Sequence, residues 1–356
     1  MSAVLRVAIA GYGLAGEVFH APLVAATDGL SLVAVTTSDA RRAARAQAAH
    51  PGVAVFADAG ELLRRSGGEI DLLVVATPNR LHVPIARRAL THRIAVVMDK
   101  PVAADAAPAA VLVEDFHAAR VPFTVFQNRR WDGDFLTVRR VHASGELGTV
   151  TRFESRYERF RPDVDAAAWR ELPGATEGGG LLLDLGAHLV DQALTLFGRP
   201  ARVYAEIAAR RPGAQVDDDV FVALEHAGGV RSHLWMSAIA PVGGRSLRLS
   251  GTRGGIHTPG LDPQEDQLAA GLRPGDDGWG AGEPARWVDA DGERALATEA
   301  GAYERFYAGV RDALTGGADM PVDARDSVAA LRVVEAARES ARSAAVIEIS
   351  TQEEVS

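Results

Sequence analysis

A glycine-rich turn directly after a short apolar run constrains this chain most. Residues 4–10 are apolar with β-branched side chains, and Gly11-Tyr12-Gly13-Leu14-Ala15-Gly16 follows at once. A helical pattern then continues to about Thr27. In such a strand, turn and helix, the first glycine permits the tight turn, the second lets a pyrophosphate approach the backbone, and the third lets helix and strand pack closely. The pattern predicts a dinucleotide-binding unit with cofactor contacts from Gly11, Tyr12, Gly13, Leu14, Ala15 and Gly16.

Strand-like and helical patterns alternate over the first third of the chain. We expect strands at residues 4–10, 30–36, 53–56, 71–76, 94–98 and 122–126, with helices between them. This alternation predicts an α/β fold, with a doubly wound parallel sheet in a Rossmann domain at residues 1–126. Ligands on such sheets bind at the carboxyl ends of the strands. Those ends carry Thr77, Pro78, Asn79, Asp99 and Lys100.

The length of 356 residues suggests a second domain, which we place at residues 127–356. Helical patterns at residues 134–144, 181–197, 303–314 and 323–343 accompany strand-like runs at residues 149–157, 201–208, 219–225, 230–236 and 246–251. These predict an α+β domain with a largely antiparallel open sheet. Residues 252–300 are rich in Gly, Pro and Asp, and we interpret them as a long irregular segment.

Charge and composition disfavour several kinds of partner. A net charge of −9 with acids and bases interspersed argues against nucleic acid, because phosphate binding needs a basic face. No apolar run approaches the ~20 residues of a membrane span, so we expect no membrane association. The absence of cysteine removes disulfides, thiolate metal sites and a cysteine nucleophile, and it is compatible with the cytoplasm, where we place the protein.

The end of the second expected strand indicates which dinucleotide binds. An acidic residue there would hold the ribose hydroxyls of NAD. This chain has Thr36-Thr37-Ser38 instead, with Arg41 and Arg42 shortly after. Hydroxyls and guanidinium groups suit a 2′-phosphate, which favours NADP. Two alternatives stay open: Asp39 reaches the ribose of NAD, or Ser38 or Asp39 caps the next helix.

A triple glycine precedes a second candidate functional segment. Gly178-Gly179-Gly180 leads into an apolar helical run that carries Asp184, His188 and Asp191. Helical spacing places the three polar side chains on one face. A carboxylate one turn from a histidine can fix its tautomer and raise its basicity, which suits a general base near neutral pH. The alternative is an ordinary solvated helix face.

Polar residues also crowd around a tryptophan in Gln127-Asn128-Arg129-Arg130-Trp131-Asp132. Such a cluster suits a sugar or polyol, whose hydroxyls need donors and acceptors and whose ring needs an apolar face; the alternative is an interdomain salt-bridge cluster. Lys100 stands at an expected strand end, where an ammonium can bind a substrate hydroxyl or stabilise a developing oxyanion. The alternative for Lys100 is a solvated side chain.

Together these motifs resemble the Gfo/Idh/MocA family of nicotinamide-dependent oxidoreductases, nearly from end to end. Its markers here are the glycine turn with Phe19-His20-Ala21-Pro22, Thr77-Pro78-Asn79 with His82, Asp99-Lys100-Pro101, and Asp184-x-Gly186-x-His188. Residues 128–137, 261–265 and 277–280 look closest to the branch that contains NADP-dependent scyllo-inositol dehydrogenase.

The resemblance implies that Lys100, Asp184 and His188 form the catalytic set. In the family's usual Glu-Lys-Pro tripeptide, Asp99 replaces the Glu here, and Leu183 stands where close relatives carry a Tyr. Family members pair the sheets of their second domains face to face, which implies a homodimer or homotetramer.

We therefore expect an NADP(H)-dependent enzyme that transfers a hydride between nicotinamide and a secondary alcohol or ketone of a cyclitol or sugar, without a metal ion. Besides the glycine turn, the expected cofactor contacts are Thr36, Thr37, Ser38, Arg41, Thr77, Pro78, Asn79, His82, Asp99, Lys100, Asn128 and Trp279, with His20 at the cofactor's edge. The expected substrate contacts are Lys100, Arg129, Trp131, Tyr157, Asp184 and His188. The alternatives are an NAD-dependent sugar dehydrogenase, an NAD-assisted glycoside hydrolase, a metal hydrolase using Asp184, His188 and Asp191, and a sugar- or nucleotide-sensing regulator on the same fold.

Overall fold

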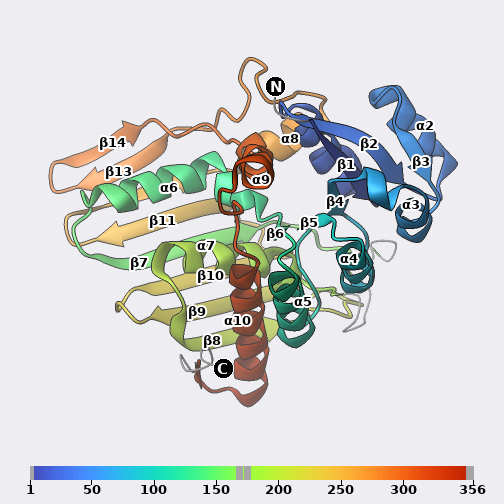
Figure 1. Cartoon of the computed structure of the whole chain (residues 1–356). Helices are drawn as coiled ribbons and strands as arrows, with labels where there is room; N and C mark the ends of the chain where they lie inside the picture. Colours follow the sequence, from blue (N-terminus) through green and yellow to red (C-terminus); the bar gives the residue numbers. More distant parts are fainter. Residues whose placement is uncertain (1–3, 166–170, 172–177, 350–356) are drawn as a thin grey trace. The chain divides into compact units, whose positions relative to one another are not determined.

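The computed structural model describes residues 4–165, 171 and 178–349 (Figure 1). Within that part of the chain, the residues form two compact units. The first comprises Met1–Trp131, Gln264–Trp279 and Ala302–Val328, and the second comprises Asp132–Pro263, Gly280–Gly301 and Ala329–Ser356. The first unit thus contains two later stretches that the expected division at residue 126 assigns to the second domain.

The first unit is built on a parallel sheet that has six strands among the described residues, in the order β3-β2-β1-β4-β5-β6. Every neighbouring pair is parallel, which confirms the predicted doubly wound sheet. The strands are β1 (Leu5–Ala10), β2 (Leu30–Thr36), β3 (Ala54–Phe56), β4 (Leu72–Val75), β5 (Ala95–Met98) and β6 (Phe123–Val125). Strands β4 and β5 are buried along their whole length, as expected when helices cover both faces of a parallel sheet.

Helices alternate with these strands. They are η1 (Ala15–His20), α1 (Ala21–Ala25), α2 (Ala40–Ala49), α3 (Ala59–Ser66), η2 (Gly67–Glu69), η3 (Asn79–Leu81), α4 (His82–Thr91), α5 (Ala106–Ala119) and η4 (Asn128–Trp131). Helices α8 (Gln264–Ala269) and α9 (Glu304–Gly316) come from the later stretches and pack on η1 and α1. Aromatic packing explains why α9 belongs to this unit: the ring of Phe306 lies 5.0 Å from that of Phe126 and 5.6 Å from that of Trp131.

The second unit is built on a mixed sheet with nine strands within the described ranges, in the order β14-β13-β12-β11-β7-β10-β9-β8-β15. Only the β7–β10 pair is parallel among them, so the expectation of a largely antiparallel sheet is confirmed. The strands are β7 (Val150–Glu158), β8 (Pro200–Ala208), β9 (Asp219–His226), β10 (Arg231–Ser237), β11 (Arg245–Gly251), β12 (Gly254–Pro259), β13 (Ala285–Asp289), β14 (Gly292–Leu296) and β15 (Ile347–Glu348).

Helices cover one face of this sheet. Helix α6 (Gly133–Ser144) packs on β11 and β12, and α7 (Ala187–Phe197), which follows η6 (Leu182–Gly186), packs on β10 (Figure 1). The last helix, α10 (Ala324–Ser343), crosses the division between the two units. Along β9, every second residue from Val220 to His226 is buried and the alternate residues are half-buried, which is the pattern of a sheet with one covered face.

The interpretation of residues 252–300 as irregular is wrong. They contain β12, β13, β14 and α8. Strand β12 opens with two glycines, which weaken any sequence signal for a strand, yet a side chain on Gly254 would lie 2.8 Å from Val288 O of the neighbouring β13. Close approach of the two backbones therefore requires glycine there. Strand β14 is exposed at four of its five residues, so it shows no apolar alternation.

Candidate functional site

The glycine turn has the geometry that its sequence predicts. Gly11 has a φ of +100°, and a Cβ there would collide with Ala76 O at the end of β4. A Cβ on Gly16 would collide with Gly11 O and would lie 3.4 Å from Cγ2 of Ile9, so helix and strand do pack closely at Gly16. The buried Thr36 hydroxyl accepts a hydrogen bond from Gly11 N at 2.9 Å. Thr36 therefore holds the turn from the adjacent strand.

The middle of the turn is more open. A Cβ on Gly13 would meet only Nη1 of Arg42, at 4.0 Å, and Leu14 is 63% exposed. Tyr12 instead points into the apolar core, and Ala15 packs against that core. The turn leads into η1, a π-helical segment. π-helices are well under 1% of residues in globular proteins and are frequent at functional sites.

The segment after β2 resolves one of the alternatives at this strand end. Oδ1 of Asp39 accepts hydrogen bonds from Arg41 N at 2.8 Å and from Arg42 N at 2.9 Å, which caps α2. These backbone N–H groups, Arg42's first, lower the pKa of Asp39. The capping interpretation of Asp39 is therefore confirmed. Thr37 binds the same segment, because its hydroxyl accepts a hydrogen bond from Asp39 N. The side chain of Ser38 is exposed.

The ends of β4 and β5 bring further predicted cofactor residues together within the first unit. Oγ1 of Thr77 is buried and has no hydrogen-bond partner among the described residues. His82 is buried, its Nδ1 lies 2.8 Å from Pro101 O, and its Nε2 lies 2.8 Å from Thr77 O. Burial lowers the pKa of His82. This histidine thus links the two loops, and Asn79 is buried beside it at the start of η3.

Asp99 stands at the centre of a buried polar chain. Its Oδ1 accepts the Lys100 N–H at 2.8 Å, and its Oδ2 lies 3.9 Å from Nε2 of His20. Nδ1 of His20 lies 2.7 Å from the hydroxyl of Tyr307 on α9. Burial favours a raised pKa for Asp99, but the nearby imidazole of His20 and the charges of His82 and Lys100 outweigh it, so this pKa is lowered. The side chain of Lys100 is half-buried.

These observations fit a dinucleotide. Gly13 leaves backbone room for a pyrophosphate, and Thr77 provides a buried hydroxyl without a partner among the described residues. Arg42 places a guanidinium beside the glycine turn. The turn and the ends of β2, β4 and β5 are where a nucleotide binds on a sheet of this order.

The cluster around Trp131 is embedded in the first unit. Asn128 and Arg129 are buried in η4, and Arg129 lies 3.4 Å from the carboxylate of Glu265. Trp131 packs against Phe306 of α9. Nε1 of Trp279 donates to the carboxylate of Glu304 at 3.0 Å. These contacts tie the predicted residues Arg129, Trp131 and Trp279 to α8 and α9. The predicted contacts of these residues and of Asn128 with cofactor and substrate stay predictions.

The second candidate segment forms η6 and the start of α7, the helix that packs on β10. Asp184 lies in the π-helical η6, and His188 lies one turn later in α7. His188 and Asp191 are buried, at 5% and 2% exposed, so the alternative of a solvated helix face is wrong for them. Asp184 is half-buried. Both candidate segments of this protein thus contain a π-helical turn.

Tyr157 and a residue that the sequence analysis overlooks lie in the same unit as Asp184. The guanidinium of Arg159 stands 5.9 Å from the centre of the Tyr157 ring, and its Nε has no hydrogen-bond partner among the described residues. Burial, and then the charge of Arg161, lowers the pKa of Arg159, while Tyr157 and Asp184 act in the opposite direction. The adjoining residues are Glu and Phe, which form no known motif, so only the fold identifies this arginine.

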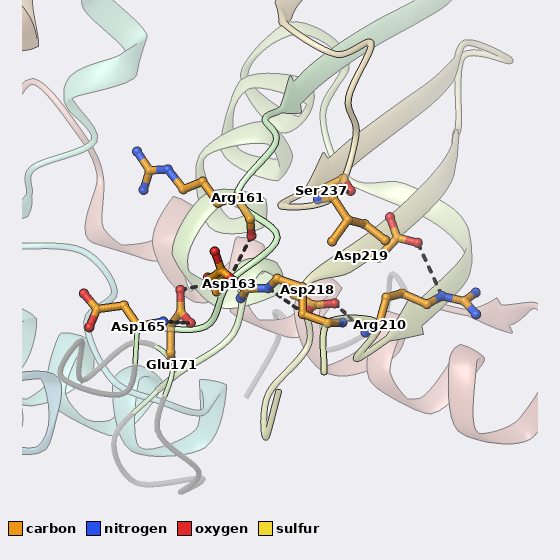
Figure 2. A network of polar contacts seen from close by, with 10 residues as sticks. Arg161, Asp163, Asp165, Glu171, Arg210, Asp218, Asp219 and Ser237 are labelled. Carbon is orange, nitrogen blue, oxygen red and sulfur yellow. Dashed lines mark hydrogen bonds and ion pairs between the residues drawn. The ribbon is translucent and has the colours of Figure 1, made fainter. Parts of the chain in front are cut away.

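A polar network fixes the segment that follows Arg159 in the chain (Figure 2). Arg211 is buried, its Nε donates to Asp218 at 2.9 Å, and its Nη1 donates to Glu171 at 3.2 Å. Nη1 of Arg211 also donates to the backbone oxygens of Arg161 and Asp163. One guanidinium therefore joins the segment after β7 to the segment before β9.

Two further findings concern metal-binding groups and membrane-spanning helices. Among the described residues, no three His, Asp or Glu side chains are grouped to hold a metal ion, so the structure gives the metal-hydrolase alternative no support. The helices within the same ranges are all too short or too polar to cross a lipid bilayer.

A dinucleotide-binding sheet, together with a second unit that carries a buried Asp–His helix, defines a two-unit nicotinamide-dependent oxidoreductase. The family comparisons agree: residues 5–127 match the model "Oxidoreductase family, NAD-binding Rossmann fold", and residues 143–349 match "Oxidoreductase family, C-terminal alpha/beta domain". The chain belongs to the Gfo/Idh/MocA family of oxidoreductases.

Individual relatives cover nearly the whole chain. The oxidoreductase YdgJ of Escherichia coli is 38% identical over 98% of this chain and 99% of its own length. The scyllo-inositol 2-dehydrogenase (NADP⁺) IolW of Bacillus subtilis is 33% identical over 95% of this chain and 94% of its own. The solved structure of the oxidoreductase yvaA from Bacillus subtilis superposes with a TM-score of 0.91, at 31% identity, and covers 98% of this chain and 99% of that one.

Proposed function

We propose that this oxidoreductase uses NADP(H) to interconvert a secondary alcohol and a ketone on a cyclitol or sugar. The observation that carries the proposal is the buried His188 one turn after the half-buried Asp184, in a chain whose relative IolW bears the name of an NADP⁺-dependent inositol dehydrogenase. Lys100, at the end of β5, completes the set of groups that such a reaction needs.

Each residue has a distinct role in this proposal. His188 accepts the hydroxyl proton as the carbon loses its hydride, and Asp184 orients the imidazole and favours its protonated form. Lys100 holds the reacting oxygen and shares the proton. The bound nicotinamide supplies the hydride acceptor or donor. Asp99, through the Lys100 N–H, fixes the backbone from which the lysine extends.

Cofactor choice rests on the end of β2. The carboxylate oxygen Oδ1 of Asp39 is engaged by the N-terminus of α2, which disfavours a role on the ribose hydroxyls of NAD. Ser38 is exposed, and Arg42 reaches the vicinity of Gly13. The Ser38 hydroxyl and the Arg42 guanidinium can bind a 2′-phosphate, so we infer a preference for NADP(H) over NAD(H).

The test is a panel of inositols, aldoses and ketoses assayed with NADP and with NAD, followed by His188→Ala on the best substrate. We expect net cofactor reduction, and a rate of alcohol oxidation that rises with pH, because His188 must be neutral to accept the hydroxyl proton. His188→Ala should lower kcat by about 10²–10⁴-fold and leave NADPH binding intact.

Two results would contradict the proposal. If His188→Ala oxidises the substrate at the wild-type rate with the same pH profile, the assignment of the base is wrong. If the enzyme cleaves glycosides without net reduction of the cofactor, the reaction is NAD(P)-assisted hydrolysis, and if it binds sugars or nucleotides without turnover, it is a regulator.

We also propose that the protein forms a homo-oligomer through the uncovered face of the second unit's sheet. That face carries aromatic side chains, with the rings of Phe221 and Trp235 5.2 Å apart and the Arg156 guanidinium 3.7 Å above Trp235. The charges of Arg152 and Glu154 beside them are mixed in sign, which suits pairing with a second copy. Trp235→Glu should yield monomers in light scattering, whereas Val242→Glu, at a 97% exposed loop position, should not.

A further inference from the structure

The segment that carries Asp184 begins against the loop that precedes β9. Oδ2 of Asp217 accepts the Leu182 N–H at 2.7 Å, and Asp217 O accepts the Leu181 N–H at 3.0 Å. These are N–H groups of the first turn, which have no partner within a helix. One residue, Asp217, therefore binds two successive N–H groups at the start of η6.

Gly180 fits this contact from the other side. It has a φ of +94°, and a Cβ there would collide with Oδ1 of Asp217. Gly180 O in turn accepts the Asp184 N–H at 3.1 Å. The backbone of Asp184 is thus bound to Gly180, and Gly180 lies directly against the Asp217 carboxylate.

The two neighbouring carboxylates have different partners. Asp218 accepts hydrogen bonds from Arg210 N and from Arg211, and Asp219 forms an ion pair with Arg210 at 3.6 Å (Figure 2). Asp217 alone of the three faces η6. Burial raises the pKa of Asp217, although the Leu182 N–H and the charge of Arg338 act against the rise. The fold thus keeps the Asp217 carboxylate at the start of the Asp184 segment, although burying it costs free energy.

We propose that Asp217 is a positioning residue for catalysis: it fixes the first turn of η6, and thereby holds the Asp184 carboxylate where it can orient His188. The proposal rests on the proposed function, because it requires Asp184 and His188 to act on the substrate. It assigns to Asp217 no contact with substrate or cofactor. Its effect is transmitted through Leu182 N and Gly180 O.

The first test replaces Asp217 with Ala. We expect kcat to fall about tenfold to 100-fold, the equilibrium effect of losing one charge-assisted hydrogen bond. The apparent pKa of the rate profile should move down, because a displaced Asp184 no longer favours protonated His188. The dissociation constant of NADPH should stay within about twofold, since the cofactor cradle lies in the first unit.

Matched variants separate positioning from general stability. Asp217→Asn keeps an oxygen that can accept the Leu182 N–H, so it should restore most of kcat and the wild-type pH profile. Asp219→Ala removes a neighbouring carboxylate whose side chain forms an ion pair with Arg210, and it should leave kcat unchanged. Amide hydrogen exchange in the full-length protein should accelerate at Leu182 in Asp217→Ala about tenfold or more, while the β9 and β10 amides keep their protection.

Gly180→Ala should disrupt the same contact between Asp217 and the start of η6 from the other side. The new methyl group would displace the Asp217 carboxylate, and the positive φ adds strain. We expect a loss of kcat similar to that of Asp217→Ala. The double variant should lose less than the product of the single losses, because both substitutions break one contact.

The outcomes are distinguishable. If Asp217→Ala keeps kcat and the pH profile while His188→Ala loses activity, the positioning role is wrong and the proposed function stands. If Leu182 exchange is unchanged in Asp217→Ala, the contact does not hold the turn and the inference fails. If His188→Ala retains wild-type rates, the proposed function fails, and the positioning role, which depends on it, fails with it.

Discussion

Arg42→Ala tests the structural basis of cofactor choice. The Arg42 guanidinium lies beside the glycine turn, 4.0 Å from where a Gly13 Cβ would stand, and its side chain is exposed on α2. Asp39, the one carboxylate in this strand-end segment, binds the helix N-terminus. If a 2′-phosphate binds here, the Arg42 guanidinium is available beside the turn to receive it.

The size of the effect follows from the exposure of the site. A hydrogen bond to a charged partner contributes about 1.5–3 kcal/mol, which corresponds to about 10–150-fold in Kd. Arg42 is solvent-exposed and shares its surroundings with the Asp39 carboxylate, so screening favours the lower end of that range. We expect NADPH to bind about tenfold more weakly to Arg42→Ala, with NADH affinity changed less than about twofold.

Calorimetric titration of both dinucleotides measures this directly. Arg41→Ala is the matched control, because Arg41 precedes Arg42 on the same helix and no contact places its side chain at the glycine turn; its effect should be smaller. The NADPH advantage of the wild type should also shrink as salt increases. Equal losses of affinity for NADPH and NADH, or tighter binding of NADH by the wild type, would refute the reasoning. Asp39 would then be the residue that binds the ribose.

Two further predictions concern the other half of the site and the network beside it. Lys100→Met should lower turnover about 10²-fold or more, the scale of losing one oxyanion donor, with little change in NADPH affinity; a collapse of cofactor binding with turnover preserved would make Lys100 a binding residue. The pKa of the buried Asp218 is lowered because the Arg210 N–H and the Arg211 guanidinium outweigh the effect of burial. A carboxyl group whose pKa is lower in the folded state than the unfolded-state value of about 3.9 stabilises the fold at higher pH. This stabilisation is lost as the pH falls through the pKa of the folded state. At pH 7 the free energy of unfolding of Asp218→Asn should therefore be about 2 kcal/mol lower than that of the wild type. Denaturant titrations should show this difference narrowing below about pH 4.

Part of the glycine turn and the start of α2 could be predicted because the contacts that shape them join residues close together in the sequence. Gly11 is crowded by Ala76 O from a strand end far along the chain, whereas Gly16 lacks a side chain because it packs against Gly11 O and Ile9 a few residues earlier, and the strand–turn–helix pattern displays that reason directly. The same is true of Asp39, whose partners are two and three residues away. The boundaries of β2 and α2 follow from such short-range signals.

Features set by distant partners were not predictable. The two glycines that open β12 hide the strand in the sequence, and Gly254 is dictated by the backbone of β13 about thirty residues later. Arg159 and Asp217 belong to no motif, and their roles depend on side chains and N–H groups that only the fold brings near. The π-helical turns at residues 15–20 and 182–186 fall in the same class, since a helical sequence pattern does not distinguish them from an α-helix.

The discontinuity of the first unit affects how the protein is made. Its core includes Tyr303, Phe306 and Tyr307, which the ribosome adds long after β6 is complete. A nascent chain of residues 1–131 therefore carries the strands β1 to β6 but lacks the aromatic groups that fill their core, and it exposes apolar surface while the second unit's sheet is synthesised. The nucleotide-binding unit can complete its core only after residues 303–307 have been added.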